Sequence, residues 1–438
     1  MLLREMILVL AAAPFVYYGL TLWASVAYFR RRARTSVNQF EYTPSVSILK
    51  PVRGLDREAY ENFASFCEQN YPEYEILFCV LTQDDPAVPV IERLQRSFPE
   101  HRIRLLVGAP PIGTSDKLNK LCRLVKEASY DVLVISDSDV RVGPNYLQDV
   151  VAPFGDPKVG AVTVLFRSLI GGSFGARLDA SGSAVEFATS ALLSQRLEGI
   201  RFTLGFTMAT TKERLAEIGG FEGFASYYVD DYELGRRITQ RGYRVELART
   251  IVSMVYPLES LFQFVRHELR WTIGLRNVRP IGHAAIGFTF GLPWVLLAAG
   301  AAPSARLAAL YILAYLVFRS VVYLTVGVWG LQDAIVKRNW WLAPLRDMAN
   351  FGIWVTSFFT NRICWRGVDY RVKKGLLIPL VEIPLSAELN SNGVNEGGKT
   401  GLEVKEGIQL DAPLAVLTLR QANIATLVQA KGTNEGET

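Results

Sequence analysis

The sequence predicts an α/β fold, in which one cytoplasmic domain is anchored by apolar membrane segments. Residues 45–250 alternate short apolar runs with amphipathic helical patterns, as in a mainly parallel sheet with crossover helices. Met6–Phe29 has no charged residue, and four arginines between positions 30 and 34 follow it. Further long apolar runs lie after residue 280. These observations indicate an integral membrane protein with an N-terminal transmembrane helix and C-terminal transmembrane or interfacial helices.

The composition favours a membrane surface over nucleic acid as the partner. Of the 438 residues 50% are hydrophobic and 20% are charged, and the net charge is only +5. The basic residues cluster beside the apolar runs, which is typical of cytoplasmic membrane flanks. The four cysteines lack metal-ligand or redox spacing, and three histidines are too few to favour a histidine-based metal site. We therefore expect a reducing compartment and no role for nucleic acid.

The N-terminal segment, residues 1–35, is predicted to be a transmembrane helix with a basic flank. Met6–Phe29 is long enough to cross a bilayer. A signal peptide is the alternative, but the apolar run is long for one and no A-x-A-like cleavage site follows. The arginines place the next segment on the cytoplasmic side, so in a bacterium the protein would lie in the inner membrane.

Residues 40–256 are predicted to form the α/β domain. Short apolar or β-branched runs indicate its strands, and amphipathic runs indicate its helices. The expected strands are Val46–Leu49, Glu75–Leu81, Ile103–Val107, Val132–Ser136, Val159–Leu165 and Thr203–Thr210. The expected helices are Tyr60–Gln69, Pro89–Phe98, Asp116–Ala128, Arg177–Gln195 and Tyr232–Arg241.

Acidic residues follow the ends of several predicted elements. Asp137 and Asp139 follow the buried strand Val132–Ser136, and Asp84 and Asp85 follow the second strand. Ligands of open α/β sheets bind beyond the carboxyl ends of the strands. Paired carboxylates there suit Mg²⁺ or Mn²⁺ carrying a phosphate, although a solvated Asp-Ser-Asp turn is the simpler interpretation. The pair Asp230 and Asp231 precedes a helical pattern, where N-capping would explain one of the two.

The C-terminal part divides into three predicted regions. Residues 257–280 form an interfacial amphipathic helix that contains Arg270 and Trp271. Residues 281–375 contain two spans, Ile281–Ala302 and Leu307–Leu331, and then Trp340–Phe359, which we interpret as interfacial or re-entrant because Arg346 and Asp347 are costly in a span. Residues 385–438 are expected to be a polar, flexible tail.

These features together predict transfer of a sugar from a nucleotide diphosphate donor to a lipid hydroxyl. A diphosphate leaving group needs charge neutralisation, which a metal on Asp139 and Asp137 would supply. A hydroxyl nucleophile needs a general base, for which we choose Asp231, with Asp230 as the second candidate. Arg270 would stabilise the departing phosphate and Trp271 would stack on a sugar or on the acceptor.

The motifs DDPA at 84–87, DSDVRV at 137–142, VDDY at 229–232 and RHELRW at 266–271 resemble ceramide glucosyltransferase and its bacterial relatives, including the hopanoid-biosynthesis glycosyltransferase. The resemblance covers residues 6–375 and implies an inverting enzyme with a Rossmann-like GT-A domain, a UDP-hexose or UDP-N-acetylhexosamine donor and a ceramide-like or hopanoid-like acceptor. It implies donor-binding roles for Asp85, with Asp84 beside it, and for Lys117, Asn119 and Asp137, and a metal role for Asp139. Here His267 stands where the family has Gln or Arg.

Two other functions remain open from the sequence. A processive polysaccharide synthase is disfavoured because the spans are few and Gln is absent from the start of the R-W motif. A non-catalytic membrane scaffold that binds nucleotide is disfavoured by the complete acidic set. Lys117 could also be an ordinary solvated helix residue. A dehydrogenase is excluded by the absence of G-x-G-x-x-G after the first strand. The oligomeric state stays undetermined.

Overall fold

The structure is a computed structural model that describes residues 2–34, 42–170, 172–255, 260–365 and 367–380. The predicted tail, 385–438, and the start of the predicted amphipathic helix, 257–259, lie outside these residues.

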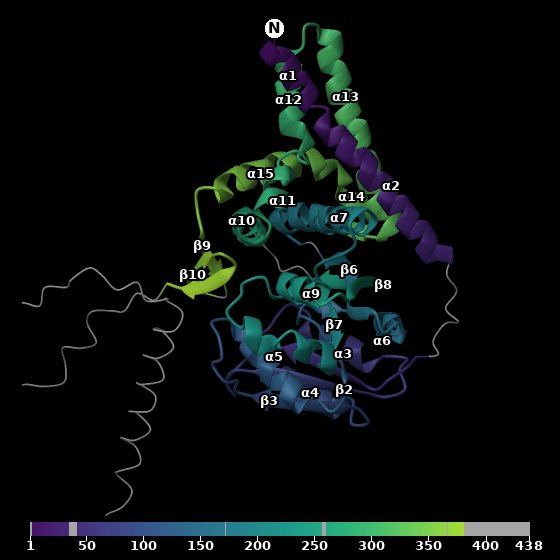
Figure 1. The fold of residues 1–438 in the computed structure, drawn as a ribbon, viewed down its shortest axis with the longest axis vertical. Coiled ribbons are helices and arrows are strands. Elements are labelled where there is room, and N and C mark those ends of the chain that lie inside the picture. Colours follow the sequence, from purple (N-terminus) through teal and green to yellow (C-terminus); the bar gives the residue numbers. More distant parts are fainter. Residues whose placement is uncertain (1, 35–41, 171, 256–259, 366, 381–438) are drawn as a thin grey trace, which may run out of the picture. The chain divides into compact units, whose positions relative to one another are not determined.

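An eight-stranded mixed sheet forms the centre of the domain and confirms the predicted α/β class (Figure 1). Its order is β3-β2-β1-β4-β7-β6-β8-β5. The first four neighbours run parallel, with Ile48 of β1 opposite both Ile76 and Val134, and β7 runs antiparallel to β4 and to β6. The strands are β1 (Val46–Pro51), β2 (Tyr74–Val80), β3 (Arg102–Val107), β4 (Val132–Ile135), β5 (Val140–Arg141), β6 (Val159–Ile170), β7 (Met208–Thr211) and β8 (Arg244–Val255).

The helices between the strands follow local sequence signals, both in where they start and in which side chains they bury. In α5, Ser115 caps the first turn by accepting a hydrogen bond from the Leu118 amide, and Leu118, Leu121 and Leu124 bury the apolar stripe. The other helices of the domain are α3 (Ala59–Cys67), α4 (Val88–Ser97), α6 (Tyr146–Val151), α7 (Phe174–Leu197), α8 (Lys212–Glu217) and α9 (Asp230–Gln240), with the short 3₁₀ turns η1 (Ala152–Gly155) and η2 (Phe221–Phe224).

Some elements differ from the sequence prediction. The predicted strand Thr203–Thr210 is wrong in its first half, because β7 starts only at Met208. Residues before it turn toward α9, since the Gly205 amide donates to the Asp231 carboxylate and the Thr203 hydroxyl donates to the Asp231 carbonyl. The sequence prediction also missed β8, the short β5, and a separate three-stranded sheet of β9 (Arg362–Trp365), β10 (Val368–Lys373) and β11 (Leu376–Pro379).

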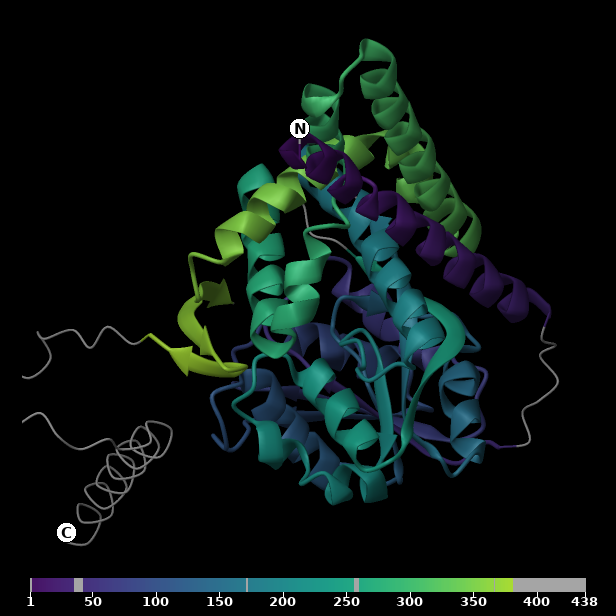
Figure 2. The same ribbon diagram turned by 45° about the horizontal axis from the view of Figure 1, so that its top comes forward.

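Two helical segments are long and apolar enough to cross a membrane, which makes this a membrane protein. They are residues 2–33, formed by α1 (Leu2–Leu10) and α2 (Ala13–Arg34), and residues 305–330, formed by α13 (Ala305–Val322) and the π-helix η3 (Tyr323–Gly330). Figure 2 shows α2 running beside α7 and the α13 segment. Both agree with the predicted spans near Met6–Phe29 and Leu307–Leu331.

The third predicted span, Ile281–Ala302, is not one straight helix. It is broken into α11 (Pro280–Ile286) and α12 (Gly291–Ala301), which are bent by 52°. Pro293 explains the break, because it has no amide hydrogen for the carbonyl of Thr289 four residues earlier. The Tyr18 hydroxyl donates to that carbonyl instead, at 3.0 Å. The 11 residues of α12 rise about 16 Å, roughly half of a bilayer core.

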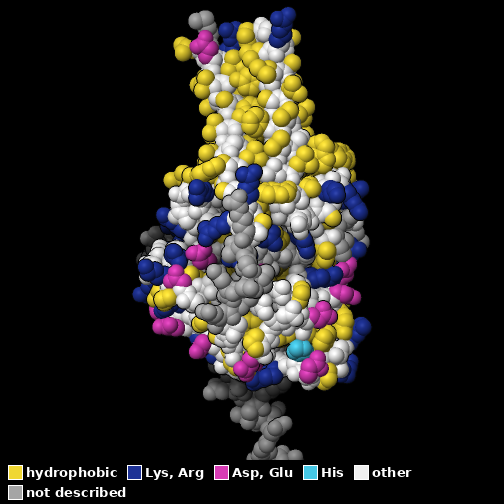
Figure 3. Space-filling view, turned by 90° about the vertical axis from the view of Figure 1, so that its right-hand side faces the viewer, with side chains coloured by type: hydrophobic (Ala, Val, Ile, Leu, Met, Phe, Trp, Pro, Cys, Tyr) yellow, Lys and Arg dark blue, Asp and Glu magenta, His cyan; other side chains and the backbone are white. Residues whose placement is uncertain are grey.

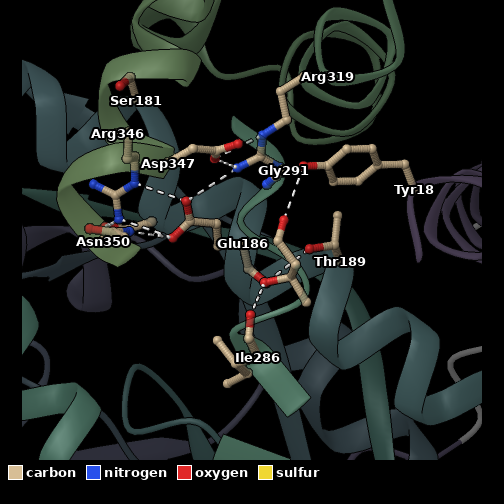
Figure 4. A network of polar contacts seen from close by, with 12 residues as sticks. Tyr18, Ser181, Glu186, Thr189, Ile286, Gly291, Arg319, Arg346, Asp347 and Asn350 are labelled. Atoms are coloured by element: carbon tan, nitrogen blue, oxygen red, sulfur yellow. Dashed lines mark hydrogen bonds and ion pairs between the residues drawn. The ribbon is translucent and has the colours of Figure 1, made fainter. Parts of the chain in front are cut away.

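The helices α7, α10 (Leu261–Val278) and α15 (Ala343–Ser357) form a layer between the sheet and the apolar helices (Figure 1). The short α14 (Ala334–Asn339) and η4 (Trp340–Leu342) lead into α15. The buried face of α15 is ionic: Arg346 binds Glu186, and Asp347 binds Arg319 of α13 at 2.5 Å (Figure 4). Arg346 also binds Glu268 of α10. The exposed face of α15 is apolar and includes Leu345 and Met348.

Candidate active site

Four of the predicted polar side chains converge around Gly205, beyond the carboxyl end of β4. A Cβ atom placed on Gly205 would lie 3.2 Å from Oδ2 of Asp137 and 3.6 Å from both Oδ2 of Asp231 and Nζ of Lys117. Asp230 joins them through Lys117. A larger side chain at position 205 would enter this space, so glycine leaves room at the centre of the cluster.

Asp231 is held firmly and is almost buried, with 7% of its surface exposed. Its Oδ2 accepts from the Gly205 amide at 3.0 Å, and its Oδ1 accepts from the Tyr232 amide at 2.7 Å. Both aspartates lie in the first turn of α9, and the N-cap residue is Val229, so capping does not explain them. Burial, and next the charge of Asp230, raise the pKa of Asp231 to about 7.

Lys117 bridges the two acidic motifs. Its Nζ lies 2.9 Å from Oδ1 of Asp137 and 3.0 Å from Oδ2 of Asp230. Burial alone would lower the pKa of Lys117, but the carboxylates of Asp137 and Asp230 outweigh it and raise that pKa above its ordinary value. Lys117 is therefore no ordinary solvated helix residue: it is a half-buried cation that joins the DSD motif to the VDDY motif.

Lys50 is a further cation at this site that the sequence reasoning missed. Its Nζ donates to the Asp137 carbonyl at 3.1 Å and lies 3.6 Å from the ring centre of Phe66. Burial lowers the pKa of Lys50 to about 7, although Asp137 and Asp139 oppose this shift. The available signal was a charged residue directly after the first predicted strand, Val46–Leu49.

Asp85 and Asp84 lie farther along the same sheet edge. Asp85 accepts hydrogen bonds from the amides of Gly54 and Ala87, at 3.0 Å each, and thereby fixes the loop after β1. That loop also carries Asp56, whose carboxylate accepts from the hydroxyl of Ser138 between the two predicted metal ligands. Asp84 is exposed. The β1 loop thus connects the DDPA motif with the DSD motif.

Asn119 has a local role in the structure. Its amide oxygen accepts from the backbone of Ile112 and Gly113, and its amide nitrogen donates to the Gly113 carbonyl at 2.9 Å. The side chain therefore shapes the loop before α5. This loop lies against Ala225, which Gly113 allows to approach closely.

The R-W motif lies on α10, which begins at Leu261 because Ser260 and Gln263 form a capping box. The indole N–H of Trp271 donates to Nε2 of His267 at 3.0 Å, and Nδ1 of His267 lies 2.8 Å from the buried carboxylate of Asp179. Because Nε2 accepts from the indole, a neutral imidazole here carries its proton on Nδ1 and donates it to Asp179. Burial would raise the pKa of Asp179, but the hydrogen bond from His267 outweighs it and lowers that pKa to about 2.

Contacts connect α10 to the cluster around Gly205. Trp271 packs on Phe187 with ring centres 5.5 Å apart, and Phe187 packs on Phe206, the neighbour of Gly205. The hydroxyl of Tyr228, three residues before Asp231, donates to the Arg270 carbonyl. Phe187 and Phe206 thus connect Trp271 to the neighbour of Gly205, and Tyr228 connects the backbone of Arg270 to the segment before Asp231.

Two groups of side chains could hold a divalent cation. Asp137 and Asp139 offer carboxylate oxygens, the ligands that Mg²⁺ and Mn²⁺ prefer, at the carboxyl end of β4. Asp179, His267 and Glu268 also place ligand atoms within 4.8 Å of one another. The second group is already engaged, because Glu268 binds Arg346 at 2.7 Å and His267 binds both Asp179 and Trp271. Asp137 is engaged as well, because Nζ of Lys117 lies 2.9 Å from its Oδ1.

Comparison with known families matches residues 6–378 to glycosyl transferase family 21. The chain is 26% identical over 260 residues to ceramide glucosyltransferase 3 of Caenorhabditis elegans, covering 56% of this chain and 54% of that protein. It is 36% identical over 101 residues to ceramide glucosyltransferase of Komagataella phaffii, covering 22% of this chain and 20% of that protein. The chain thus spans about half, or less, of the curated relatives it matches.

Among solved structures, the chain is similar to the mannosyltransferase PcManGT from Pyrobaculum calidifontis in complex with GDP-Man and Mn²⁺. The TM-score is 0.47 at 17% identity, over 80% of this chain and 99% of that chain. It is also similar to GalNAc-T7 with UDP, GalNAc and Mn²⁺, with a TM-score of 0.37 at 13% identity, over 53% of this chain and 51% of that chain. Neither likeness is close enough to carry a conclusion about ligands.

Proposed function

Because the chain belongs to glycosyl transferase family 21, as its motif order predicted, we propose that it transfers a hexose or N-acetylhexosamine from a UDP-sugar to a lipid hydroxyl. The observation that carries this proposal is the convergence of Asp137, Lys117, Asp230 and Asp231 around Gly205. Such a site combines groups that can bind a diphosphate, Asp137 with a metal and Lys117, with a carboxyl group that can accept a proton, Asp231. It lies beneath the layer of helices that we propose faces the membrane.

Asp231 is the proposed general base. Its pKa of about 7 matches a group that must accept a proton near neutral pH. The amides of Gly205 and Tyr232 hold its two oxygens in fixed directions. Attack of the activated hydroxyl opposite the leaving group is a single displacement, so an α-linked donor would give a β-glycoside. Asp230 pairs with Lys117 and tunes the pKa of its neighbour.

The donor diphosphate is proposed to lie beyond β4. Asp137 and Asp139 would hold Mg²⁺ or Mn²⁺, which supplies positive charge to the diphosphate when bound. Lys117 adds a cation, Lys50 holds the Asp137 backbone, and Arg270 would stabilise the departing phosphate from the α10 side. Asp85 acts by fixing the loop that carries Asp56.

The acceptor is proposed to reach the site from the membrane, past Trp271. Large apolar side chains are exposed on α10 and at the end of α15, among them Phe262 and Phe359. An apolar face beside a buried ionic layer suits the boundary of a bilayer. A ceramide-like or hopanoid-like alcohol would lie there with its hydroxyl directed at Asp231.

Mass spectrometry of the lipid product tests this function. Full-length protein in detergent is incubated with a panel of UDP-sugars, Mn²⁺ or Mg²⁺, and lipid acceptors, beside Asp231→Asn. The matched control is Asp131→Asn, which changes an exposed aspartate at the opposite end of β4. We expect a singly glycosylated lipid from the wild type and the control, and none from Asp231→Asn.

The same experiment separates the two other functions. A ladder of products with increasing sugar number would identify a polymer synthase. Binding of UDP without turnover of any acceptor by the wild type would support a scaffold. Full activity of Asp231→Asn would overturn the proposed base.

A further inference from the structure

A cavity of about 640 Å³ lies where α2 meets the domain, away from the Gly205 site. Its walls come from α2, the last turns of α7, the region of α6 and η1, and β8. Val159 and Arg244, the first residues of β6 and β8, line it. The Gly205 cluster lies beyond the carboxyl end of β4, which has the same direction as β6, so the two sites lie at opposite ends of the sheet.

The cavity carries an excess of positive charge. Five arginines and three carboxylates line it. Arg244 is already bound to Asp156 at 2.6 Å, and Arg196 stacks over the ring of Trp23 at 4.7 Å. Arg32 and Arg249 also line the cavity, and both act on the partly buried carboxylate of Asp149: burial raises its pKa, and both arginines oppose that shift. Five arginines against three carboxylates leave attraction for a further anion.

The cavity lies at the boundary between the uncharged part and the basic part of α2. The uncharged part of α2 ends at Phe29, and the cavity wall runs across this boundary, from Ala24 and Ala27 to Arg32. Trp23, one residue earlier, is half exposed, as is typical of a membrane interface. Figure 3 shows Lys and Arg side chains gathered below the hydrophobic column on this side of the molecule.

The cavity is also fixed in shape. The hydroxyl of Tyr28 donates to the Ala248 carbonyl of β8 at 3.1 Å, which ties α2 to the sheet at the cavity wall. Leu192 of α7 adds a buried apolar surface opposite α2. The lining thus combines apolar side chains, among them Ala24, Ala27 and Leu192, with arginines.

We propose that this cavity binds the phosphate headgroup of an anionic membrane lipid. The phosphate lies against Arg32 and Arg249, and the glycerol and first acyl carbons lie against Ala24, Ala27 and Leu192. Basic pockets on the cytoplasmic side of membrane helices suit such headgroups. This site is separate from the proposed donor and acceptor sites, and it does not depend on the sugar transfer.

Native mass spectrometry of retained lipid tests the proposal without any activity measurement. The full chain is taken from nanodiscs of mixed phosphatidylcholine and phosphatidylglycerol, and the lipids that stay bound are counted. We expect phosphatidylglycerol to be retained in preference, and Arg249→Gln or Arg32→Gln to lower its retention roughly five-fold each. Arg249→Lys keeps the charge and should retain most of the binding. Thermal unfolding confirms that each variant is folded.

Arg30→Gln is the matched control, because Arg30 is an exposed arginine on the same helix that does not line this cavity. If Arg30→Gln lowered the retention of phosphatidylglycerol equally, the lipid would be attracted to the basic flank in general, and the proposed site would be wrong. Wild-type protein that retains both lipids alike would also overturn the site. A competition arm adds soluble glycerol phosphate: displacement of phosphatidylglycerol at low concentration would mean a site for a free phosphate compound instead of a lipid.

Discussion

At the scale of single residues, Asp231 combines two opposing demands. As a base it must be ionised, yet burial and Asp230 raise its pKa to about 7, against about 3.9 for an unperturbed aspartate. Because the folded-state pKa is the higher one, this group favours folding while protonated, and that contribution is lost as the pH rises from about 4 through 7. The ionised form that catalysis needs is therefore the less stable one.

The first prediction concerns the pH dependence of transfer. We expect kcat/KM to fall about tenfold per pH unit below about 7 and to level off above it, because protonated Asp231 is not a base. Asp230→Asn removes a negative neighbour and should move this limb to lower pH. Lys117→Met removes a positive neighbour and should move it to higher pH. Shifts in the same direction in both variants would contradict the assignment of the limb to Asp231.

The second prediction concerns the contact between His267 and Trp271. His267→Phe removes the acceptor and Trp271→Phe removes the donor, and we expect each to lower kcat/KM roughly tenfold. If the two residues act as a unit, the double variant should be no worse than either single one. His101→Phe, far from α10 along the chain, is the control. Additive losses would mean that His267 and Trp271 act independently.

The sequence predicted the residues of the cluster that end strands or begin helices. Asp137 and Asp231 could be placed because one follows a predicted strand and the other begins a predicted helix. In an α/β sheet, ligands bind beyond the carboxyl ends of the strands. Asp179 and Lys50 could not. Asp179 is 88 residues from His267, and their contact depends on how α7 and α10 pack. Lys50 lies in the apolar strand β1, and the sequence pattern does not indicate which group its side chain would contact.

At the scale of elements, α15 and α7 meet through a close approach at Gly182. The buried Arg346 crosses α7 there and donates to the Leu178 carbonyl at 2.8 Å as well as to Glu186. The sequence marked Arg346 and Asp347 as costly in a span, and the structure shows that ion pairs across α7, α10 and α13 compensate them. Removing one partner of such a buried pair costs about 3–5 kcal/mol.

The third prediction tests this packing. A Cβ atom at Gly182 would lie 1.9 Å from Nε of Arg346, so Gly182→Ala should destabilise the protein by about 1–3 kcal/mol. Gly352→Ala, on α15 itself, meets nothing within 4 Å and should be neutral or slightly stabilising. Thermal unfolding in detergent measures both. Equal melting temperatures would contradict the close approach of Arg346 to α7.

Element boundaries were predictable where a local signal exists. The start of α5 was predicted correctly at Asp116, where the structure shows Ser115 capping the first turn. The break between α11 and α12 was missed, because hydrophobicity alone made Ile281–Ala302 one continuous run. The strand β8 was missed because its own sequence does not indicate its partner. It pairs with β6, and the arrangement of the whole sheet determines that pairing.

At the scale of the whole molecule, the charges predict the orientation in the membrane. The four arginines after Phe29 and the basic residues of α14 lie on the domain side, whereas the connection between α12 and α13 lies at the far end of the apolar helices (Figure 1). We expect a cysteine at Pro303 to react with an impermeant maleimide in intact cells. A cysteine at Lys337 should react only after permeabilisation. The reverse pattern would place the domain outside.

The most direct test of the proposed chemistry is the release of UDP with and without a lipid acceptor. Wild-type protein should release UDP only when the acceptor is present. Asp231→Asn should bind the UDP-sugar as tightly as the wild type but release UDP at least about 100-fold more slowly, because a general base typically contributes that much. Release of UDP by Asp231→Asn at the wild-type rate, or release that no acceptor alters, would contradict the central claim.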